Sequence, residues 1–139
     1  MNEDFLDQVY AIEIESFRYP YPKHLLRHFL ALFPDFFLIA LHGEKVTGYI
    51  VGAIRRRVLG HIISLAVKKE YRRKGIAWRL LEKLEDQFRK NGVKIFRLEV
   101  EATNDAAVSL YLRRGFKMAY VIPNYYPGGE PCVVMFKKA

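Results

Sequence analysis

The central stretch of the chain combines clustered positive charge with a glycine, in the order Glu70-Tyr71-Arg72-Arg73-Lys74-Gly75-Ile76-Ala77. An apolar, β-branched run precedes it at residues 62–67, and apolar residues recur at helical spacing after it. This pattern predicts a strand, a basic turn and a helix. The first N–H groups of a helix have no internal partner, the helix dipole adds positive charge there, and a glycine lets a phosphate approach the backbone. We therefore predict a site for a phosphorylated ligand, with a pyrophosphate favoured.

The same turn has a simpler explanation, because a basic loop with one glycine is often only solvated. It is neither a Walker loop, which needs Gly-Lys-Ser/Thr, nor a dinucleotide fingerprint, which needs three glycines. The net charge of +8 is uneven, since residues 1–17 carry five acids and no base. Strong positive charge suits either nucleic acid or a ligand with several phosphates. No nucleic-acid-binding motif is legible, so we favour the phosphorylated cofactor and expect no direct role for nucleic acid.

Length and composition restrict the class of protein. The 139 residues suit one domain, 1–139, and 51% hydrophobic with 14% aromatic residues excludes a disordered chain. The lone Cys132 excludes an internal disulfide and a cysteine-based metal site, so a cytoplasmic location is the simplest expectation. No apolar run is long enough to span a bilayer, and no signal peptide or histidine-carboxylate metal set is apparent. We expect no membrane and no metal.

Periodicity predicts an α/β fold with a mixed sheet and helices on both faces. Helical spacing indicates a first helix over residues 4–16, with its acids outward, and a second over about 23–33. The long helix after the basic turn ends at Asn91-Gly92, and Thr103-Asn104-Asp105 caps another over about 105–113. Strands are predicted at residues 36–41, 46–54, 62–67, 95–100, 116–122 and 132–136, with a basic connection over 55–60.

Several motifs resemble one enzyme superfamily over nearly the whole chain. Arg72-x-x-Gly75-x-Ala77 resembles the acyl-CoA pyrophosphate loop of the GNAT acetyltransferases, whose pattern is Gln/Arg-x-x-Gly-x-Gly/Ala. Residues 60–67 with 71–77 are very close to the catalytic subunits of archaeal and eukaryotic N-terminal acetyltransferases. Residues 98–100, the pattern Asn104-x-x-Ala107-x-x-Leu110-Tyr111 and Gly115-Phe116 resemble those enzymes and the bacterial ribosomal-protein alanine acetyltransferases, RimI. The resemblance implies a GNAT fold with a mostly antiparallel central sheet.

The chain departs from this family at three places. Relatives usually begin with a strand before the first helix, and here that strand is missing or very short. The last motif usually reads Gly-Glu-Asp-Ala and is Gly129-Glu130-Pro131-Cys132 in this chain. Some relatives carry a glutamate near positions 17–18 that helps to select small or acidic N-termini. Phe17 and Arg18 stand there instead, and with the aromatic-proline stretch after them they suggest an apolar pocket.

Acetyl transfer to an amine requires a bound thioester, a neutral amine, a stabilised oxyanion and a protonated leaving thiolate. The resemblance implies that acetyl-CoA is bound by the turn residues Arg72, Arg73, Lys74, Gly75, Ile76 and Ala77. It also implies that the pantetheine arm pairs with Leu65, Ala66 and Val67, with the Val67 N–H facing the thioester oxygen. An ordinary core strand is the alternative for these three residues.

Four polar residues are candidates for the chemistry itself. Alternation places Glu99 with Arg97 on one sheet face, where a glutamate is usually inert. In RimI-like enzymes the matching glutamate is the proposed general base, and in archaeal relatives the residue matching His61 helps it to hold a catalytic water. The resemblance makes Tyr111 the general acid toward the sulfur and places Asn104 against the cofactor arm. Packing of the tyrosine ring and helix capping by the asparagine are the alternatives.

The substrate follows from resemblance and from acid–base chemistry together. Asn124-Tyr125-Tyr126-Pro127 resembles the tyrosine loop laid over a peptide's first residues, so Phe17, Tyr19, Tyr125 and Tyr126 are the expected substrate contacts. An α-amine has a pKa of about 7.7–8.0 and a lysine about 10.4, so near pH 7 roughly a tenth of α-amines are already neutral. A single glutamate acting through water therefore suits an α-amine better than a lysine. Cys132 matches no family nucleophile, so direct transfer is expected.

We therefore predict an acetyl-CoA-dependent N-acetyltransferase acting on the N-terminus of a protein or peptide. Ribosomal proteins are candidate partners, and a monomer or weak homodimer is expected. Two alternatives stay open. One is a GNAT enzyme for a small amine or for lysine side chains. The other is a CoA-binding or nucleic-acid-binding module without activity, against which the joint presence of Glu99 and Tyr111 argues.

Overall fold

The computed structural model describes residues 1–139 and contains four helices and six strands. The helices are α1 (Leu6–Ser16), α2 (Lys23–Leu32), α3 (Ile76–Lys90) and α4 (Asp105–Arg113), with short 3-10 turns at Glu3–Phe5, Pro34–Phe36 and Lys69–Tyr71. The strands are β1 (Phe37–His42), β2 (Lys45–Arg55), β3 (Leu59–Val67), β4 (Ile95–Glu101), β5 (Lys117–Ile122) and β6 (Cys132–Lys138). No helix has the length and apolar character needed to cross a bilayer.

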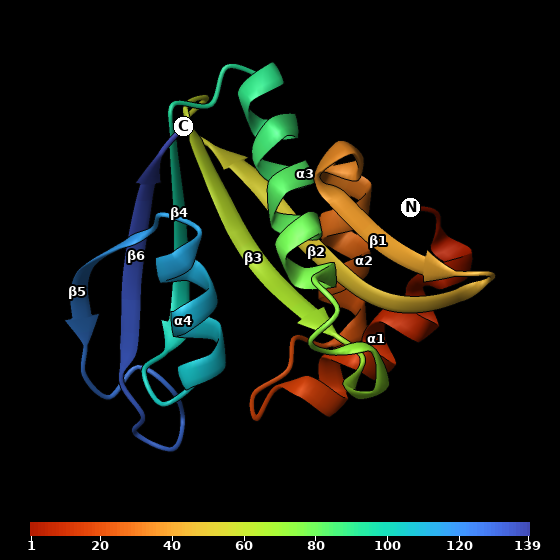
Figure 1. The fold of residues 1–139 in the computed structure, drawn as a ribbon, viewed down its shortest axis with the longest axis horizontal. Helices are drawn as coiled ribbons and strands as arrows, with labels where there is room; N and C mark the ends of the chain where they lie inside the picture. Colours follow the sequence, from red (N-terminus) through yellow and green to blue (C-terminus); the bar gives the residue numbers. More distant parts are fainter.

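The six strands form one sheet in the order β1-β2-β3-β4-β6-β5, and every neighbouring pair is antiparallel except β3 with β4. That parallel pair is short, since only residues 59–62 of β3 match residues 95–98 of β4. Beyond this point the two strands diverge, as Figure 1 shows. The predicted mixed, mostly antiparallel α/β fold is confirmed, and the divergence divides the sheet into two halves.

Helices cover both faces of the sheet (Figure 1). On one face α3 and α4 enclose a core built around Leu81, Phe88 and Phe96. On the other face α1 and α2 enclose a second core that includes Leu6, Val9 and Tyr49. Adjacent residues of β2 alternate between the two cores, as the period of a strand requires.

Two local predictions need correction. The predicted basic connection over residues 55–60 is a tight turn over 56–58, because β2 continues to Arg55 and β3 begins at Leu59. The first helix was expected to direct its acids outward, but Glu13 is 1% exposed. Its position explains the error, because it follows Leu6 by seven residues and Val9 by four and so lies on the same helical face. Residues 3–5, which directly precede α1, form a 3-10 turn.

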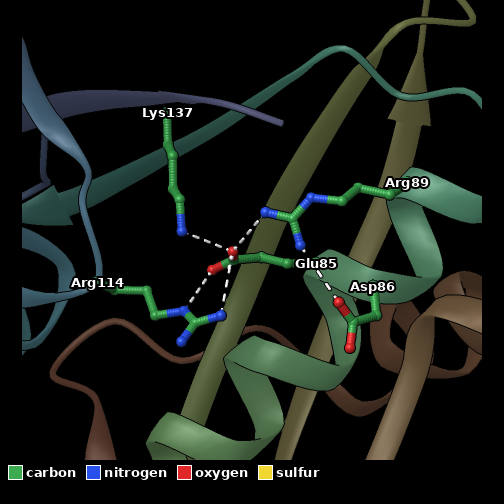
Figure 2. Close-up of polar contacts among 5 residues, drawn as sticks. All are labelled: Glu85, Asp86, Arg89, Arg114 and Lys137. Atoms are coloured by element: carbon green, nitrogen blue, oxygen red, sulfur yellow. Dashed lines mark hydrogen bonds and ion pairs between the residues drawn. The ribbon is translucent and has the colours of Figure 1, made fainter.

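A second buried carboxylate connects the helices of one face to the end of the sheet. Glu85 of α3 is fully buried and accepts hydrogen bonds from three cationic side chains, as Figure 2 shows. Arg114 Nε lies 2.9 Å from Glu85 Oε2, Lys137 Nζ 2.7 Å from Oε1 and Arg89 Nη2 3.3 Å from Oε1. Arg114 follows α4 directly and Lys137 belongs to β6. Glu85 therefore fixes the C-terminal end of α4 against α3.

Replacing Glu85 by alanine should lower the free energy of unfolding by about 3–5 kcal/mol, because Arg114 and Lys137 would be left partly buried without their counter-charge. Urea denaturation of the purified variant measures this loss. Asp86→Ala is the matched control, since Asp86 is exposed and pairs only with Arg89 at 3.3 Å. We expect that variant to lose no more than about 1 kcal/mol. Equal losses in the two variants would contradict the structural role of Glu85.

Candidate active site

Two adjoining cavities occupy the region where β3 and β4 separate. The larger, which we call the wide cleft, has a volume of about 880 Å³ and lies between β3, the basic turn, α3 and α4. The smaller, the inner chamber, has a volume of about 190 Å³ and is lined by β3, β4 and two loops, residues 17–22 and residues 123–131. Both cavities share six lining residues, which are Ser16, Phe17, Leu65, Asn104, Ala107 and Tyr111.

The basic turn presents uncovered backbone to the wide cleft. Gly75 has φ +80°, and a Cβ built there would meet no atom within 4 Å, so the space beside it is open. Helix α3 begins immediately afterwards without a side-chain cap, which leaves the N–H groups of its first turn free. The predicted residues Arg72, Arg73, Gly75, Ile76 and Ala77 all line this cleft.

The cations of the turn differ in their surroundings. Arg72 Nε donates to the Val67 carbonyl at 2.9 Å and so closes the end of β3. The ammonium of Lys74 lies 5.4 Å from the centre of the Tyr71 ring and does not line the cleft. A cofactor contact of Lys74 stays a prediction with no support from its position.

The separated part of β3 offers a free edge to the cleft. Leu65, Ala66 and Val67 line the wide cleft and pair with β2 on one side only. The register between β2 and β3 shifts at Val51 and Gly52, because Ile63 is an extra residue that forms a bulge. Apart from the Val67 carbonyl, which accepts from Arg72, the outward backbone groups of residues 63–67 are therefore available to pair with an extended ligand.

Glu99 lies in the inner chamber between two basic partners. His61 Nε2 is 2.6 Å from Glu99 Oε2, and Arg97 Nε donates to Glu99 Oε1 at 2.8 Å. Burial raises the pKa of the Glu99 carboxyl, but the hydrogen bonds and charges of His61 and Arg97 outweigh burial, so this pKa lies below its ordinary value. The structure thus brings Glu99 and His61 together and keeps the carboxylate ionised near neutral pH.

Tyr111 lines both cavities and presents an unpaired hydroxyl to them. Its side chain is 7% exposed, and its ring packs edge-to-face on Phe116 with centroids 5.8 Å apart. The hydroxyl makes no hydrogen bond within the protein. Every fully buried side-chain oxygen in the structure has a hydrogen-bond partner, so the Tyr111 oxygen is not fully buried and reaches a cavity surface. Burial raises the pKa of Tyr111, which keeps the hydroxyl protonated.

Asn104 has a structural role and also lines both cavities. Its side-chain oxygen accepts from the Ala107 N–H at 3.2 Å and caps α4. The side-chain nitrogen makes no hydrogen bond within the protein and is free for a ligand. The capping explanation and the predicted ligand contact are compatible.

Two aromatic loops enclose the inner chamber and contact each other. Phe17 and Tyr19 come from the loop between α1 and α2, and Tyr125 and Tyr126 come from the loop between β5 and β6. The rings of Tyr19 and Tyr126 stack with centroids 5.6 Å apart. The Tyr19 hydroxyl donates to both oxygens of Glu130, at 2.9 and 3.1 Å, and Arg18 pairs with the same carboxylate. The unusual Gly-Glu-Pro-Cys motif therefore joins the two loops through its glutamate.

Several residues that line or support the site were not predicted from the sequence. Arg97 shares the sheet face of Glu99, and this alternation was a usable signal. Tyr21 lies between two prolines in a stretch already noted as aromatic. Glu13 and Ser64 line the inner chamber, and the helical spacing of Glu13 with Leu6 was the available signal. Trp78 lines the wide cleft at the start of α3, and nothing in its spacing marked it.

The cavities fit acetyl-CoA. The turn offers free N–H groups and arginines for a pyrophosphate, the open space beside Gly75 admits a phosphate, and the free edge of β3 admits an amide-containing arm. A sheet divided in this way, with a protonated tyrosine where its two cavities meet and an ionised glutamate in the inner one, is typical of an acyl-CoA-dependent N-acyltransferase.

Comparison with known proteins agrees with this class. Residues 6–116 match the model of the acetyltransferase (GNAT) family. An uncharacterized N-acetyltransferase of Methanocaldococcus jannaschii is 41% identical over 96% of this chain and 85% of its own length. An N-alpha-acetyltransferase of Saccharolobus solfataricus is 33% identical over 95% of this chain and 86% of its own. The structure of the NatC complex bound to Gag peptide and CoA superposes with a TM-score of 0.91 at 27% identity, over 99% of this chain and 92% of that one. The chain belongs to the GNAT acetyltransferase family, and the enzyme class and the use of acetyl-CoA are confirmed.

Gly75→Ala should raise the KM for acetyl-CoA by about tenfold or more, because its methyl group would enter the space that a phosphate requires. A non-glycine residue at positive φ also costs about 1–2 kcal/mol of stability. Gly92→Ala isolates that cost, since Gly92 has φ +81° with equally open surroundings but lies beyond the far end of α3. Steady-state kinetics and thermal unfolding of both variants separate the two effects. Parallel rises in KM would contradict phosphate binding at Gly75.

Proposed function

We propose that this enzyme transfers the acetyl group of acetyl-CoA directly to the α-amine of a protein or peptide N-terminus. One observation carries the proposal. Glu99, which is hydrogen-bonded to His61, and Tyr111 line one small chamber that is also lined by two aromatic loops and that adjoins the wide cleft. The relatives named N-alpha-acetyltransferase and the peptide-bound NatC structure support it.

In this mechanism acetyl-CoA supplies the acetyl group as an activated thioester. Arg72, Arg73 and the N–H groups at the start of α3 bind its pyrophosphate, and the free edge of β3 aligns its arm. The Val67 N–H donates to the thioester oxygen as negative charge develops there.

Glu99 takes the proton that the amine loses, directly or through a water held with His61, while the amine nitrogen bonds to the acetyl carbon. Tyr111 gives its hydroxyl proton to the departing sulfur. The products are an acetylated N-terminus and free CoA, so no covalent enzyme intermediate is needed.

The chamber also supports a choice of substrate. Phe17, Tyr19, Tyr21, Tyr125 and Tyr126 provide an apolar wall for the first residue, and no glutamate stands at positions 17–18. The expected monomer or weak homodimer stays a prediction. Cys132 is a free, buried thiol, which suits a reducing compartment such as the cytoplasm. Ribosomal proteins are among the candidate substrates.

Mass spectrometry of a peptide panel tests the function. Each peptide contains one internal lysine and is supplied with a free or a blocked N-terminus, with and without acetyl-CoA. We expect acetylation only at free termini, and most rapidly with an apolar first residue. Equal modification of blocked peptides would establish lysine acetylation instead. Absence of transfer while acetyl-CoA still binds would reject a peptide N-terminus as the substrate of the isolated chain.

A further inference from the structure

The carboxylate of Glu13 lies at the base of the inner chamber and connects four elements of the fold. It comes from α1, is 1% exposed and accepts three hydrogen bonds. The Ser64 hydroxyl of β3 donates to Oε1 at 2.7 Å, the Tyr49 hydroxyl of β2 donates to the same oxygen, and the Tyr21 N–H donates to Oε2 at 2.9 Å. The last bond holds the loop between α1 and α2.

Tyr21 depends on that bond for its position. Pro20 and Pro22 flank it and have no N–H, so Tyr21 provides the only backbone donor of residues 20–22. Its ring lines the inner chamber and packs edge-on against Phe29 of α2, with centroids 6.2 Å apart. Burial raises the pKa of Tyr21 to about 12, and the neighbouring Tyr125, Glu13 and Glu99 contribute to the rise. Tyr21 and Glu99 line the same chamber.

Ser64 gives the same carboxylate a second connection to the site. It follows the bulge at Ile63, where β3 leaves β4 and its free edge begins. Glu13 thus connects the loop on the substrate side directly to the strand on the cofactor side.

Packing alone does not require a charge at this place. An isolated carboxylate is costly to bury, and an apolar residue would fit beside Leu6 and Val9 in the same core. The three hydrogen-bond donors offset the cost of burying the Glu13 carboxylate only if the loop, β2 and β3 keep their present positions. A carboxylate here therefore selects one arrangement of the loop.

We propose that Glu13 is a positioning residue that fixes Tyr21 as a wall of the amine subsite, in the chamber that Glu99 also lines. This inference rests on the proposed function. Loss of the carboxylate releases the loop, so the peptide binds less well, while the wide cleft and the bound acetyl-CoA are unaffected.

Steady-state kinetics with both substrates test the proposal on Glu13→Gln. Hydrogen bonds to a charged group are strong enough that we expect the peptide KM to rise about tenfold or more. The KM for acetyl-CoA should change less than about twofold, and kcat at saturating peptide less than about threefold. Thr47→Val is the control, because it removes a partly buried hydrogen bond, from the Thr47 hydroxyl to the Ala40 carbonyl at 3.2 Å, and Thr47 lines neither cavity. It should lower the melting temperature without changing either KM.

Tyr21→Ala provides an independent test, since it removes the wall and keeps the buried carboxylate. It should reproduce the rise in peptide KM, and combining it with Glu13→Gln should add less than the sum of the two effects. An unchanged peptide KM in both single variants, or equal rises for peptide and acetyl-CoA, would overturn the positioning role. If Glu13→Gln does not fold, the peptide KM of Tyr21→Ala alone decides whether the proposal stands, and an unchanged value overturns it. A wild-type enzyme that acetylates no free N-terminus would instead reject the proposed function.

Discussion

Glu99→Gln should lower kcat/KM for a peptide by about 10²–10³-fold, because removal of a general base commonly costs 10²–10⁴. The amide has the same shape and retains an oxygen for Arg97, so the fold and the KM for acetyl-CoA should change little. The measurement is steady-state acetylation of a peptide with a free N-terminus. Full activity of this variant would show that the amine needs no carboxylate at this place.

Glu101→Gln is a closely matched control for this prediction. Glu101 lies two residues further along β4, lines the same chamber, and its side chain is 18% exposed, as is that of Glu99. It pairs with Arg18 at 3.7 Å rather than with His61. We expect less than about a fivefold loss, since Glu101 has no role in proton transfer.

The pH dependence of kcat/KM follows from the ionisation of the Glu99 carboxylate. The pKa of Glu99 is lowered, so the ionised base is present at every pH above its ordinary value of about 4.5. The rise of kcat/KM with pH should therefore follow the α-amine of the peptide and level off near pH 8. For peptides whose α-amines have a higher pKa, the rise of kcat/KM should move to higher pH, and for those with a lower pKa it should move to lower pH. If the rise stays at the same pH for all such peptides, it belongs to a group of the enzyme rather than to the peptide amine.

Tyr111→Phe should lower kcat by about 10²-fold without loss of stability. The ring keeps its contact with Phe116, and the hydroxyl makes no hydrogen bond in the protein, so folding loses nothing measurable. The departing thiolate, however, loses its proton donor. Single-turnover kinetics with thermal unfolding of the same sample measure both quantities. Tyr10→Phe, at a half-buried tyrosine of α1 that lines neither cavity, should change neither quantity.

If Tyr111→Phe leaves kcat unchanged, the Tyr111 ring has only a packing role and water protonates the sulfur. A result with lower stability would show that the hydroxyl is bonded in solution. The two outcomes are distinct, because the first appears only in the rate and the second only in the melting temperature.

Local signals predicted most of the elements. Helix α4 was predicted with its observed bounds because Asn104 caps its start and Gly115, with φ +99°, follows its end. Alternation along β4 predicted correctly that Glu99 and Arg97 share a face. The turn at Gly75 was predicted from one glycine between cations and a helical stripe. In each case a few neighbouring residues determine the local conformation.

Features that depend on distant parts of the chain could not be predicted in this way. The divergence of β3 from β4 is a property of two strands some thirty residues apart, and no residue in either strand signals it. The helical spacing of Glu13 with Leu6 was a signal for its burial, but its hydrogen bonds could not be predicted, because the three donors come from β2, β3 and a loop. Similarly, Glu130 had no assigned contact until the structure placed Arg18 and Tyr19 beside it, more than a hundred residues away.

The position of β6 has a consequence for how the enzyme matures during synthesis. This strand is the last of the six to be translated, yet it lies between β4 and β5 and carries Lys137 to the buried Glu85. The first half of the sheet, with α1, α2 and β1 to β3, can assemble as the chain emerges. Strand β5 and the Tyr125–Tyr126 loop have no sheet to join until residues 132–138 have been added. A nascent chain therefore carries its phosphate turn long before it can complete the chamber, and catalysis must await the synthesis of β6.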